Sequence, residues 1–313
     1  MKKILVTGAC GFAGKYLTDY LSRGEDEIYG TYLHDNDENK NEKIKLHKID
    51  LTNEDGVYNL ISDISPDRIF HLAALTSPKD SFKNPKETFQ NNIASEINIL
   101  EVLRKRDMRS TRVIIISSAE IYGQVSKDDL PIDEGTPFNP TSPYAVSKLA
   151  QDFLALQYFN AHKLPIVRLR PFNHTGVGQT PNFVIPSFAK KIAEIEKGKL
   201  DKLTVGNLEA KRDFTDVRDM VRAYTLAADK AEPGQAYNIG SGKSYKIGDI
   251  LSKLLSFSNT DIKVEEDSSL LMPFDNPELV CDFSKFEKAT GWRPKIPIDQ
   301  TLKETLDYWR SIT

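Results

Sequence analysis

Two side chains in the stretch 142–148 have the chemistry of a proton-transfer pair. Tyr144 and Lys148 are four residues apart, so a helix that begins here would carry both on one face, one turn apart. A neighbouring ammonium group stabilises a phenolate and lowers the pKa of the phenol towards a working pH. An exposed tyrosine and lysine on an amphipathic helix would show the same spacing, so the surrounding elements have to decide between the two interpretations.

A hydroxyl and a carboxyl lie at the end of an apolar run. Residues 112–118 have the apolar character of a buried parallel strand, with Ser118 at its end and Glu120 two residues beyond. Ligands of parallel α/β sheets bind beyond the carboxyl ends of the strands, so Ser118, Tyr144 and Lys148 could converge on one carbonyl. That set suits hydride transfer from a nicotinamide, because the hydroxyls can polarise or protonate the oxygen. Glu120 could act as a base, contact a sugar hydroxyl or cap a turn.

Three glycines near the start of the chain form a candidate diphosphate-binding turn. The apolar run 3–7 is followed by Gly8, Gly11 and Gly14 and then by an amphipathic helix. This spacing lets backbone N–H groups approach a diphosphate at a helix N-terminus, where the helix dipole also favours anions. A tight turn alone could use the same glycines, but their place directly after a strand is the context that dinucleotide binding requires.

Strand and helix alternate along the first half of the chain. Further strands are predicted over 27–33, 44–51 and 67–74, and a helix over 89–103. This alternation predicts an α/β protein with a Rossmann-type doubly wound parallel sheet.

The second half is predicted to add a smaller α/β lobe that binds the substrate. Amphipathic helices are expected over 247–255 and 298–309, with Trp292 and Trp309 as core anchors. We expect the dinucleotide-binding domain to comprise 1–175 and about 211–245, and the smaller lobe to comprise about 176–210 and 246–313.

The ends of the second and third predicted strands leave the choice between NAD and NADP open. A dinucleotide fold usually places there an acid for the adenosine ribose, or an Arg for a 2′-phosphate. Residues 31–35 contain no Arg, and Asp35 is the nearby acid. Asp50 could accept from an adenine amino group or cap the helix that follows. His71 is predicted to be packed within its strand.

Composition excludes several classes of function. The 313 residues carry a net charge of −3, which does not suggest a nucleic-acid-binding protein or a basic membrane-surface protein. No apolar run approaches the roughly 20 residues needed to cross a bilayer, and the N-terminus lacks the apolar region of a signal peptide. Cys10 and Cys281 show no metal spacing and are interpreted as free thiols, so a cytoplasmic protein without a metal site is expected.

Together these pieces resemble the extended short-chain dehydrogenase/reductases over essentially the whole chain. The resemblance implies a hydride mechanism on a nucleotide sugar, in which Ser118 and Tyr144 bind the reacting oxygen and Tyr144 is the acid/base. Lys148 would bind the nicotinamide ribose and lower the pKa of Tyr144. Relatives commonly dimerise through the helices that correspond to 89–103 and 144–159, so a homodimer is expected. The matching residues imply NAD or NADP held by Gly8, Gly11, Phe12, Ala13, Gly14, His34, Asp50, Leu51, Leu72, Ala73, Ala74, Asn92, Ser117, Tyr144 and Lys148.

The segments 170–179 and 205–219 are similar to the GDP-mannose branch of that family, which mostly uses NADP. Arg suits diphosphate oxygens, although Arg212 could instead form a surface ion pair with Asp213 or Asp216. Met272 departs from the branch, because an Arg usually stands there. Leu33 and His34 also depart from it, since they occupy the region where NADP-dependent relatives carry Arg. The resemblance implies a nucleotide-diphosphate sugar, GDP-linked, bound by Thr76, Asn173, Phe183, Val184, Lys190, Arg212 and Asp275.

Two activities of this branch compete, a 4-keto-6-deoxymannose reductase and a GDP-mannose 4,6-dehydratase. The stretch 212–219 resembles the reductases, and Ser118 stands where dehydratases usually carry Thr. Glu120 occupies the position of the dehydratase base, but similar reductases keep a Glu there too. The reductase is therefore favoured, with the dehydratase or an epimerase as the alternative. A cofactor-binding scaffold without turnover is a third hypothesis, which would have little reason to retain Ser118, Tyr144 and Lys148.

Overall fold

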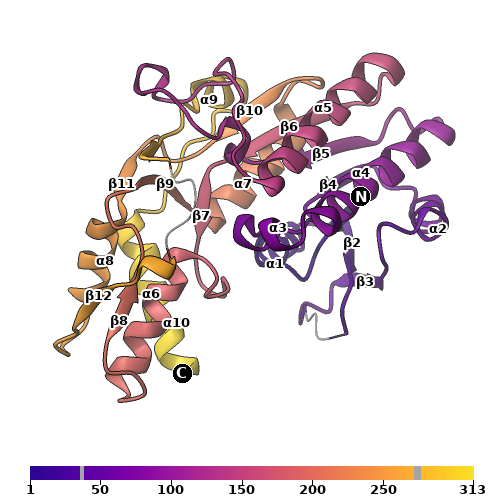
Figure 1. Ribbon diagram of the computed structural model, residues 1–313. Helices are drawn as coiled ribbons and strands as arrows, with labels where there is room; N and C mark the ends of the chain where they lie inside the picture. Colours follow the sequence, from indigo (N-terminus) through magenta and orange to yellow (C-terminus); the bar gives the residue numbers. More distant parts are fainter. Residues whose placement is uncertain (36–38, 271–275) are drawn as a thin grey trace.

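The computed structural model describes residues 1–35, 39–270 and 276–313. Its main element is a seven-stranded sheet in the order β10-β6-β5-β4-β1-β2-β3, in which every pairing is parallel (Figure 1). The chain builds outwards from β1 first on one side and then on the other, which is the predicted doubly wound arrangement. The strands are β1 (Lys3–Thr7), β2 (Glu27–Tyr32), β3 (Ile44–Lys48), β4 (Arg68–His71), β5 (Arg112–Ile116), β6 (Ile166–Pro171) and β10 (Ala236–Ile239).

Alternate side chains of the large sheet pack into two separate cores. In β1, Ile4 and Val6 belong to the core that includes residues of α1 and α7, whereas Leu5 belongs to the core that includes α2, α4 and α5. This two-residue alternation is what a sheet buried on both faces requires. The predicted helix 89–103 lies within α4. The covering helices are α1 (Phe12–Leu21), α2 (Glu54–Ile64), α4 (Pro85–Lys105), α5 (Pro143–His162) and α7 (Val217–Lys230).

A second group of elements forms the smaller lobe, seen on the left of Figure 1. Strand β9 lies between β11 and β13 and also pairs with β7, while β12 pairs with β8. Residues of α6, α8 and α10, among them Trp309, share one core. The predicted helix 247–255 coincides with α8. The elements are β7 (Asn173–Thr175), β8 (Leu203–Val205), β9 (Lys211–Asp216), β11 (Ser244–Lys246), β12 (Val264–Glu266), β13 (Glu278–Leu279), α6 (Val184–Glu196), α8 (Ile247–Leu255) and α10 (Ile298–Ile312).

One helix of the C-terminal part packs against the large sheet. Helix α9 (Ser284–Thr290) contacts β10 and α7, and Phe286 and Trp292 lie in the same core as Ile4. Trp292 is fully buried and Trp309 is 9% exposed, which confirms that both tryptophans are core anchors. Residues in the range 246–313 therefore contribute both to one core of the large sheet and to the core of the smaller lobe. Four short helices complete the described chain: α3 (Pro78–Lys83) and the 3₁₀ helices η1 (Ala119–Tyr122), η2 (Lys127–Asp129) and η3 (Ser268–Leu270).

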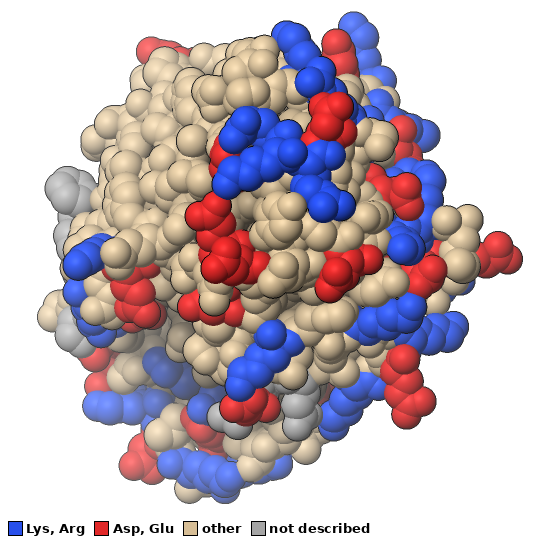
Figure 2. Space-filling model, turned by 90° about the vertical axis from the view of Figure 1, so that its right-hand side faces the viewer, with Lys and Arg blue, Asp and Glu red and all other residues tan. Residues whose placement is uncertain are grey.

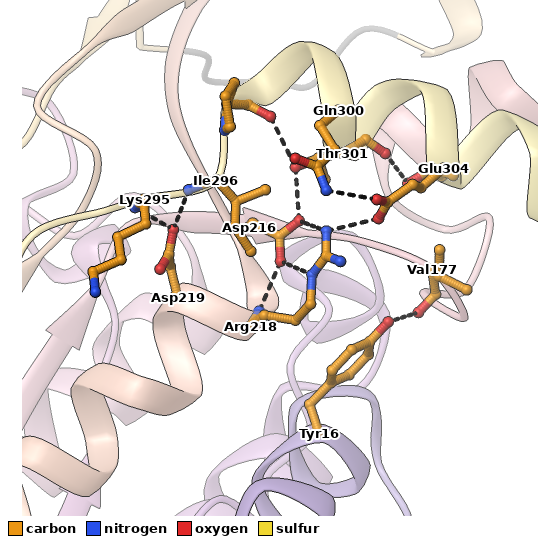
Figure 3. Close-up of polar contacts among 12 residues, drawn as sticks. Tyr16, Val177, Asp216, Arg218, Asp219, Lys295, Ile296, Gln300, Thr301 and Glu304 are labelled. Carbon is orange, nitrogen blue, oxygen red and sulfur yellow. Dashed lines mark hydrogen bonds and ion pairs between the residues drawn. The ribbon is translucent and has the colours of Figure 1, made fainter.

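Polar contacts join α10 to the start of α7 (Figure 3). Asp216 is the N-cap of α7, and its carboxylate accepts two hydrogen bonds from the Arg218 guanidinium at 2.8 Å and one from the Thr301 hydroxyl at 2.7 Å. Nearby, the Tyr16 hydroxyl of α1 donates to the Val177 carbonyl at 2.8 Å. Helices that cover the large sheet are thus bonded directly to segments of the smaller lobe.

Acidic and basic side chains are interspersed on the face shown in Figure 2. Ion pairs also form between charged side chains, for example between Lys45 and Glu27 at 2.6 Å across the neighbouring strands β2 and β3. In the described parts of the chain, no helix combines the length and apolar character needed to span a membrane. Cys10 and Cys281 are both buried and free, as predicted.

Candidate active site

Tyr144 and Lys148 lie in the first two turns of α5 and are turned into the protein. The Ser142 hydroxyl caps this helix by accepting from the Ala145 N–H at 3.1 Å. The Tyr144 N–H donates to the Ser81 hydroxyl of α3, also at 3.1 Å. Because Tyr144 is only 7% exposed and Lys148 only 4%, the interpretation as an exposed pair on an amphipathic helix is wrong.

The phenol of Tyr144 lies against the end of β5. Ser118 is the N-cap of η1, where its hydroxyl accepts from the Glu120 N–H at 3.1 Å. Burial raises the pKa of Tyr144 to about 12; the Ser118 side chain lies close enough to lower this pKa, whereas the charge of Glu120 raises it. The structure therefore brings these three side chains together and keeps the phenol protonated near neutral pH.

The ammonium of Lys148 is bound by another side chain of the same helix. It donates to Oε1 of Gln151 at 2.7 Å. Burial lowers the pKa of Lys148 to about 8, against the carboxyls of Glu96 and Asp152, which raise it. The sequence predicted that Lys148 would lower the pKa of Tyr144. In this structure the pKa of Tyr144 is raised instead, because burial outweighs the other influences.

The turn between β1 and α1 has room for little more than backbone. Gly8 has a φ of +68°, which favours glycine, and a Cβ at Gly14 would lie 2.0 Å from the Gly8 carbonyl oxygen. Helix α1 begins after Gly11 with no hydrogen bond from a side-chain cap and no acid in its first turn, among the described residues. Its first backbone N–H groups and the positive end of its dipole can therefore receive an anion, which fits the diphosphate of a dinucleotide.

The ends of β1 and β4 are tied together beside this turn. The Thr7 hydroxyl accepts from the N–H groups of Leu72 and Ala73 at 3.1 and 3.2 Å, and lies 2.9 Å from Nδ1 of His71. His71 is buried, which confirms the prediction that it is packed within its strand, and burial lowers its pKa to about 3. A Cβ at Gly8 would lie 3.1 Å from the Ala73 backbone. The small residues Ala73 and Ala74 thus follow the strand where the glycine turn comes closest.

Asn92 of α4 supports the segment after β4. Its side-chain oxygen accepts from the Leu75 N–H at 2.8 Å, and its side-chain nitrogen donates to the Ser147 hydroxyl at 3.0 Å and to the Leu75 carbonyl at 3.2 Å. Its own carbonyl accepts from Gln151 at 2.7 Å. Asn92 is fully buried. The side-chain amide of Asn92 is therefore already engaged within the protein, and its predicted contact with the cofactor stays a prediction.

Asp50 and Leu51 shape the turn between β3 and α2. One oxygen of the exposed Asp50 carboxylate accepts from the N–H of Thr52 at 2.9 Å and from its hydroxyl at 2.7 Å. Asn53, and not Asp50, caps α2, by accepting from the Gly56 N–H at 3.0 Å. Leu51 is buried in the core beneath α2.

The end of β2 carries a paired acid. Asp35 forms an exposed ion pair with Lys48 of the neighbouring strand at 2.5 Å, and His34 beside it is exposed.

At the centre of the sheet, the buried Ser117 hydroxyl donates to the Lys148 carbonyl at 3.3 Å. Ser117 therefore joins the end of β5 to α5.

Arg212 and Asn173 lie on neighbouring strands of the smaller sheet. Asn173 is in register with Phe214, two residues beyond Arg212. The Arg212 guanidinium donates to the carbonyls of Lys211 and Asn276, both at 2.7 Å. These bonds direct the side chain along the edge where β9 meets β13.

The acids that follow Arg212 have their own partners. Asp213 is buried and accepts from the N–H groups of Ser241 at 2.7 Å and Gly242 at 2.8 Å. Asp216 is bound to Arg218.

Three of the predicted substrate-binding residues lie at the start and in the middle of α6. Phe183 is the N-cap residue and is 38% exposed, and Val184 is the first residue of the helix. Lys190 pairs with Glu194 at 3.7 Å and lies over the ring of Trp309 at 5.7 Å. Lys190 is therefore engaged with α10 and its own helix.

Asp275, which was predicted to bind the substrate, lies outside the described residues, and so does Met272. Thr76, also predicted to bind the substrate, is exposed in the segment between β4 and α3.

Sequence reasoning missed three side chains of the site. Gln151 binds Lys148, Ser81 binds the Tyr144 backbone, and Glu96 influences Lys148 through its charge. Gln151 is three residues after Lys148, so its helical spacing could have indicated the contact. Ser81 and Glu96 come from other helices, and only the packing of α3 and α4 against α5 brings them close.

The doubly wound sheet, the glycine turn and the set of Ser118, Tyr144 and Lys148 are those of an extended short-chain dehydrogenase/reductase. The family model described as GDP-mannose 4,6 dehydratase matches residues 5–305, and the chain belongs to that family.

Named relatives agree on this family. The chain is 33% identical over 311 residues to GDP-6-deoxy-D-mannose reductase of Pseudomonas aeruginosa, covering 99% of this chain and 98% of that protein. It is 28% identical to GDP-mannose 4,6 dehydratase 1 of Arabidopsis thaliana, covering 98% of this chain and 89% of that protein.

Solved structures with the same fold contain nicotinamide nucleotides. The structure of RMD from Pseudomonas aeruginosa complexed with NADPH superposes with a TM-score of 0.88 at 32% identity, covering all of both chains. The UDP-glucose 4-epimerase of Thermus thermophilus complexed with NAD has a TM-score of 0.88 at 27% identity, covering 99% of this chain and 100% of that one.

Proposed function

We propose that the protein reduces the 4-keto group of a GDP-4-keto-6-deoxy-mannose-type sugar with a reduced nicotinamide nucleotide. The observation that carries this proposal is the buried, protonated phenol of Tyr144, which lies beside Ser118 at the carboxyl edge of the sheet. Reduction of a ketone needs a proton donor at the oxygen, and a phenol with a raised pKa is such a donor. The identity to the Pseudomonas aeruginosa reductase over the whole chain supports the choice of substrate.

The residues of the glycine turn and the neighbouring strand ends would hold the cofactor. Gly8, Gly11 and Gly14 let the backbone approach the diphosphate, with Phe12 and Ala13 in the first turn of α1. A nicotinamide supplies the hydride when it is bound. NADP is favoured because a similar structure contains NADPH, although the exposed Asp35–Lys48 pair at the end of β2 leaves NAD as the alternative.

The chain's own side chains handle the oxygen and its proton. The hydroxyls of Ser118 and Tyr144 would bind the keto oxygen, and Tyr144 would donate its proton to it as the alcohol forms. Lys148 can exchange its bond to Gln151 for one to the nicotinamide ribose, because both are oxygen acceptors. The Lys148 charge would then stabilise the phenolate left on Tyr144.

The test of this proposal is a reduction assay. Purified protein with the GDP-4-keto-6-deoxy sugar should oxidise NADPH or NADH, which is followed by absorbance at 340 nm. Mass spectrometry should then detect the GDP-6-deoxy sugar as the product. Failure with both nucleotides would rule the reductase out.

A 4,6-dehydratase is the second candidate, favoured by the position of Glu120. This carboxyl lies close enough to Tyr144 to raise the pKa of the phenol, so a base is present beside the proton donor. A dehydratase would convert GDP-mannose alone into a 4-keto product with no net consumption of nucleotide. Formation of that product would move the assignment to the dehydratase.

Arg212 is expected to bind the nucleotide diphosphate, with Asn173 beside it. The Arg212→Ala variant should raise the KM for the GDP-sugar by about 10- to 100-fold, because a charge-assisted hydrogen bond contributes about 1.5–3 kcal/mol. Steady-state kinetics at saturating NADPH measures this, and kcat should change far less. The matched control is Lys211→Ala, which removes the neighbouring exposed cation. An equal rise in KM for both variants would contradict a specific role for Arg212.

The remaining expectations concern the assembly. We infer two units. The nucleotide-binding unit is built around the large sheet and includes α9, and the substrate-binding unit is built around β9 with α6, α8 and α10.

A homodimer through α4 and α5 is proposed because Val146 and Phe153, seven residues apart on α5, are 39% and 48% exposed. A cytoplasmic location is proposed from the free cysteines.

A further inference from the structure

A short turn of the smaller lobe, residues 175–179, is held together by its own hydrogen bonds. The Thr175 hydroxyl donates to Oε1 of Gln179 at 2.8 Å, and Nε2 of Gln179 donates to the His174 carbonyl at 3.1 Å. The Gln179 N–H donates to the Gly176 carbonyl at 3.3 Å. Gln179 itself is buried. The turn is therefore a compact unit, and its position depends on the elements that it packs against.

Helix α1, which covers the large sheet, contacts this turn and β7 through two aromatic side chains. The Tyr16 hydroxyl points at the turn and donates to the Val177 carbonyl at 2.8 Å (Figure 3). Burial raises the pKa of Tyr16 to about 12, so the phenol keeps the proton of this bond at neutral pH. One helical turn earlier, the ring of Phe12 lies nearly parallel to the ring of His174, with 7° between their planes and 6.2 Å between their centroids.

Gly176 sets how closely the turn approaches its neighbours. A Cβ at this position would lie 2.8 Å from Cγ1 of Val217, the buried first residue of α7, and 3.8 Å from Cζ of Phe12. The branched side chain of a buried valine has little freedom to move aside. The turn is therefore seated against α7 and α1 at a distance that leaves no room for a side chain.

The residues on either side of the turn are predicted to bind the nucleotide sugar. Asn173 lies two residues before it in β7, and Phe183 and Val184 follow at the start of α6. Helix α1 itself begins at the glycines that are proposed to hold the cofactor diphosphate. A shift of the turn away from α1 would therefore move the predicted substrate residues relative to the cofactor.

We propose that Tyr16 is a positioning residue for the nucleotide sugar: its bond to Val177 holds the turn 175–179 in the place where Asn173 and the start of α6 receive the nucleotide diphosphate. This inference rests on the proposed function, which supplies the class of substrate. Tyr16 does not need to touch the sugar for this role. Without its hydroxyl the turn is free to move in the unliganded protein, and nucleotide binding has to restore its position, which weakens the affinity.

The test is nucleotide binding by the full chain with Tyr16→Phe, measured by isothermal titration calorimetry with GDP. The Kd for GDP should rise by about 3- to 10-fold, the range that the net contribution of one hydrogen bond allows. The Kd for NADPH should stay nearly unchanged, because the glycines and the first N–H groups of α1 are intact. The control Tyr20→Phe removes a hydroxyl one turn further along α1, where the ring lies beneath the Arg23 guanidinium, and should leave both Kd values unchanged.

Gly176→Ala probes the seating of the turn without removing the hydroxyl of Tyr16. The added methyl group should push the turn away from Val217 and raise the Kd for GDP by at least as much as Tyr16→Phe does. The control Gly24→Ala, just after α1, adds a methyl group whose nearest neighbour is the Leu21 carbonyl oxygen at 3.5 Å, and it should have no effect. Gly176→Ala also decides the question if Tyr16→Phe does not fold.

Two results would overturn the inference: a Kd for GDP in Tyr16→Phe equal to that of the wild type, or Kd values for GDP and NADPH raised by the same factor, which indicates a general loosening of the protein. If the wild type binds UDP and not GDP, the same comparisons apply to UDP, and binding of neither overturns the inference. A selective rise in the Kd for the nucleotide without turnover of the sugar would refute the proposed reductase and leave the role of Tyr16 intact.

Discussion

Replacing Tyr144 with Phe is expected to reduce kcat by about 10²- to 10⁴-fold, the range usual for loss of a general acid. The phenol is buried beside Ser118 and protonated, with its pKa raised to about 12. Phe has the same ring but cannot donate a proton to the keto oxygen. NADPH binding should persist, because the glycine turn and Lys148 are unchanged. Stopped-flow or steady-state assays at saturating sugar measure the loss, and calorimetry measures the binding.

The matched control for this variant is another tyrosine of α5. The hydroxyl of Tyr158 donates to Glu101 at 2.8 Å, about four turns further along the helix. Tyr158→Phe should therefore keep wild-type kcat while losing a comparable hydrogen bond. Full activity in Tyr144→Phe would refute the mechanism shared by the reductase and the dehydratase.

The second large effect concerns stability. Asp152→Asn is expected to lower the free energy of unfolding by about 3–5 kcal/mol, the cost of breaking a buried ion pair by removing one partner. Asp152 is fully buried, and its carboxylate binds Arg168 at 2.7 Å and Arg170 twice at 2.9 Å. The Asn amide has a similar shape but leaves both guanidiniums without a counter-charge. Urea denaturation at pH 7 measures the difference.

The stability difference between the wild type and Asp152→Asn should depend on pH in a direction that the pKa of Asp152 sets. Burial alone would raise the pKa of the Asp152 carboxyl, but Arg170 and Arg168 outweigh burial and hold the pKa below its ordinary value. The resulting stabilisation is present above the pKa of the unfolded carboxyl, about 3.9, and is lost as the pH falls through the lower native pKa. The gap between wild type and Asp152→Asn should therefore be complete at pH 7 and shrink below about pH 4.

The control is a carboxylate in a partly exposed ion pair. Asp307 of α10 binds Lys303 at 2.6 Å and Arg310 at 3.0 Å, with 44% of its side chain exposed. Asp307→Asn should cost less than about 1 kcal/mol. An equal loss in both variants would show that the burial of Asp152 adds nothing.

Local patterns in the sequence were sufficient to predict the large sheet and to select Ser118, Tyr144 and Lys148 as the candidate catalytic set. The end of β1 at Thr7 and, to within two residues, the end of β5 at Ile116 could be predicted because the apolar runs are followed there by glycine or polar residues. The start of α5 could be predicted because Ser142 and Pro143 are a cap and a first-turn residue. These features depend on neighbours within a few positions.

The remaining features depend on contacts between distant segments. The raised pKa of Tyr144 comes from burial beneath elements that its neighbours in sequence do not reveal. Asn92 was predicted as a cofactor contact, but nothing local indicated that its amide binds Leu75 and Ser147, the second of which is 55 residues away. Helix α9 returns to the large sheet through Phe286, which no local periodicity indicates.

The route of the chain between the seven-stranded sheet and the four-stranded sheet limits how such a protein can change its substrate. Only Phe172 separates β6 of the large sheet from β7 of the smaller one, and β9 passes directly into α7 at Val217. After β10 the chain leaves the large sheet again, and α9 brings it back. The smaller lobe is therefore not a segment that recombination could exchange between relatives in one piece. New specificity in this lineage should arise by substitutions within segments such as 176–183, and not by shuffling of modules.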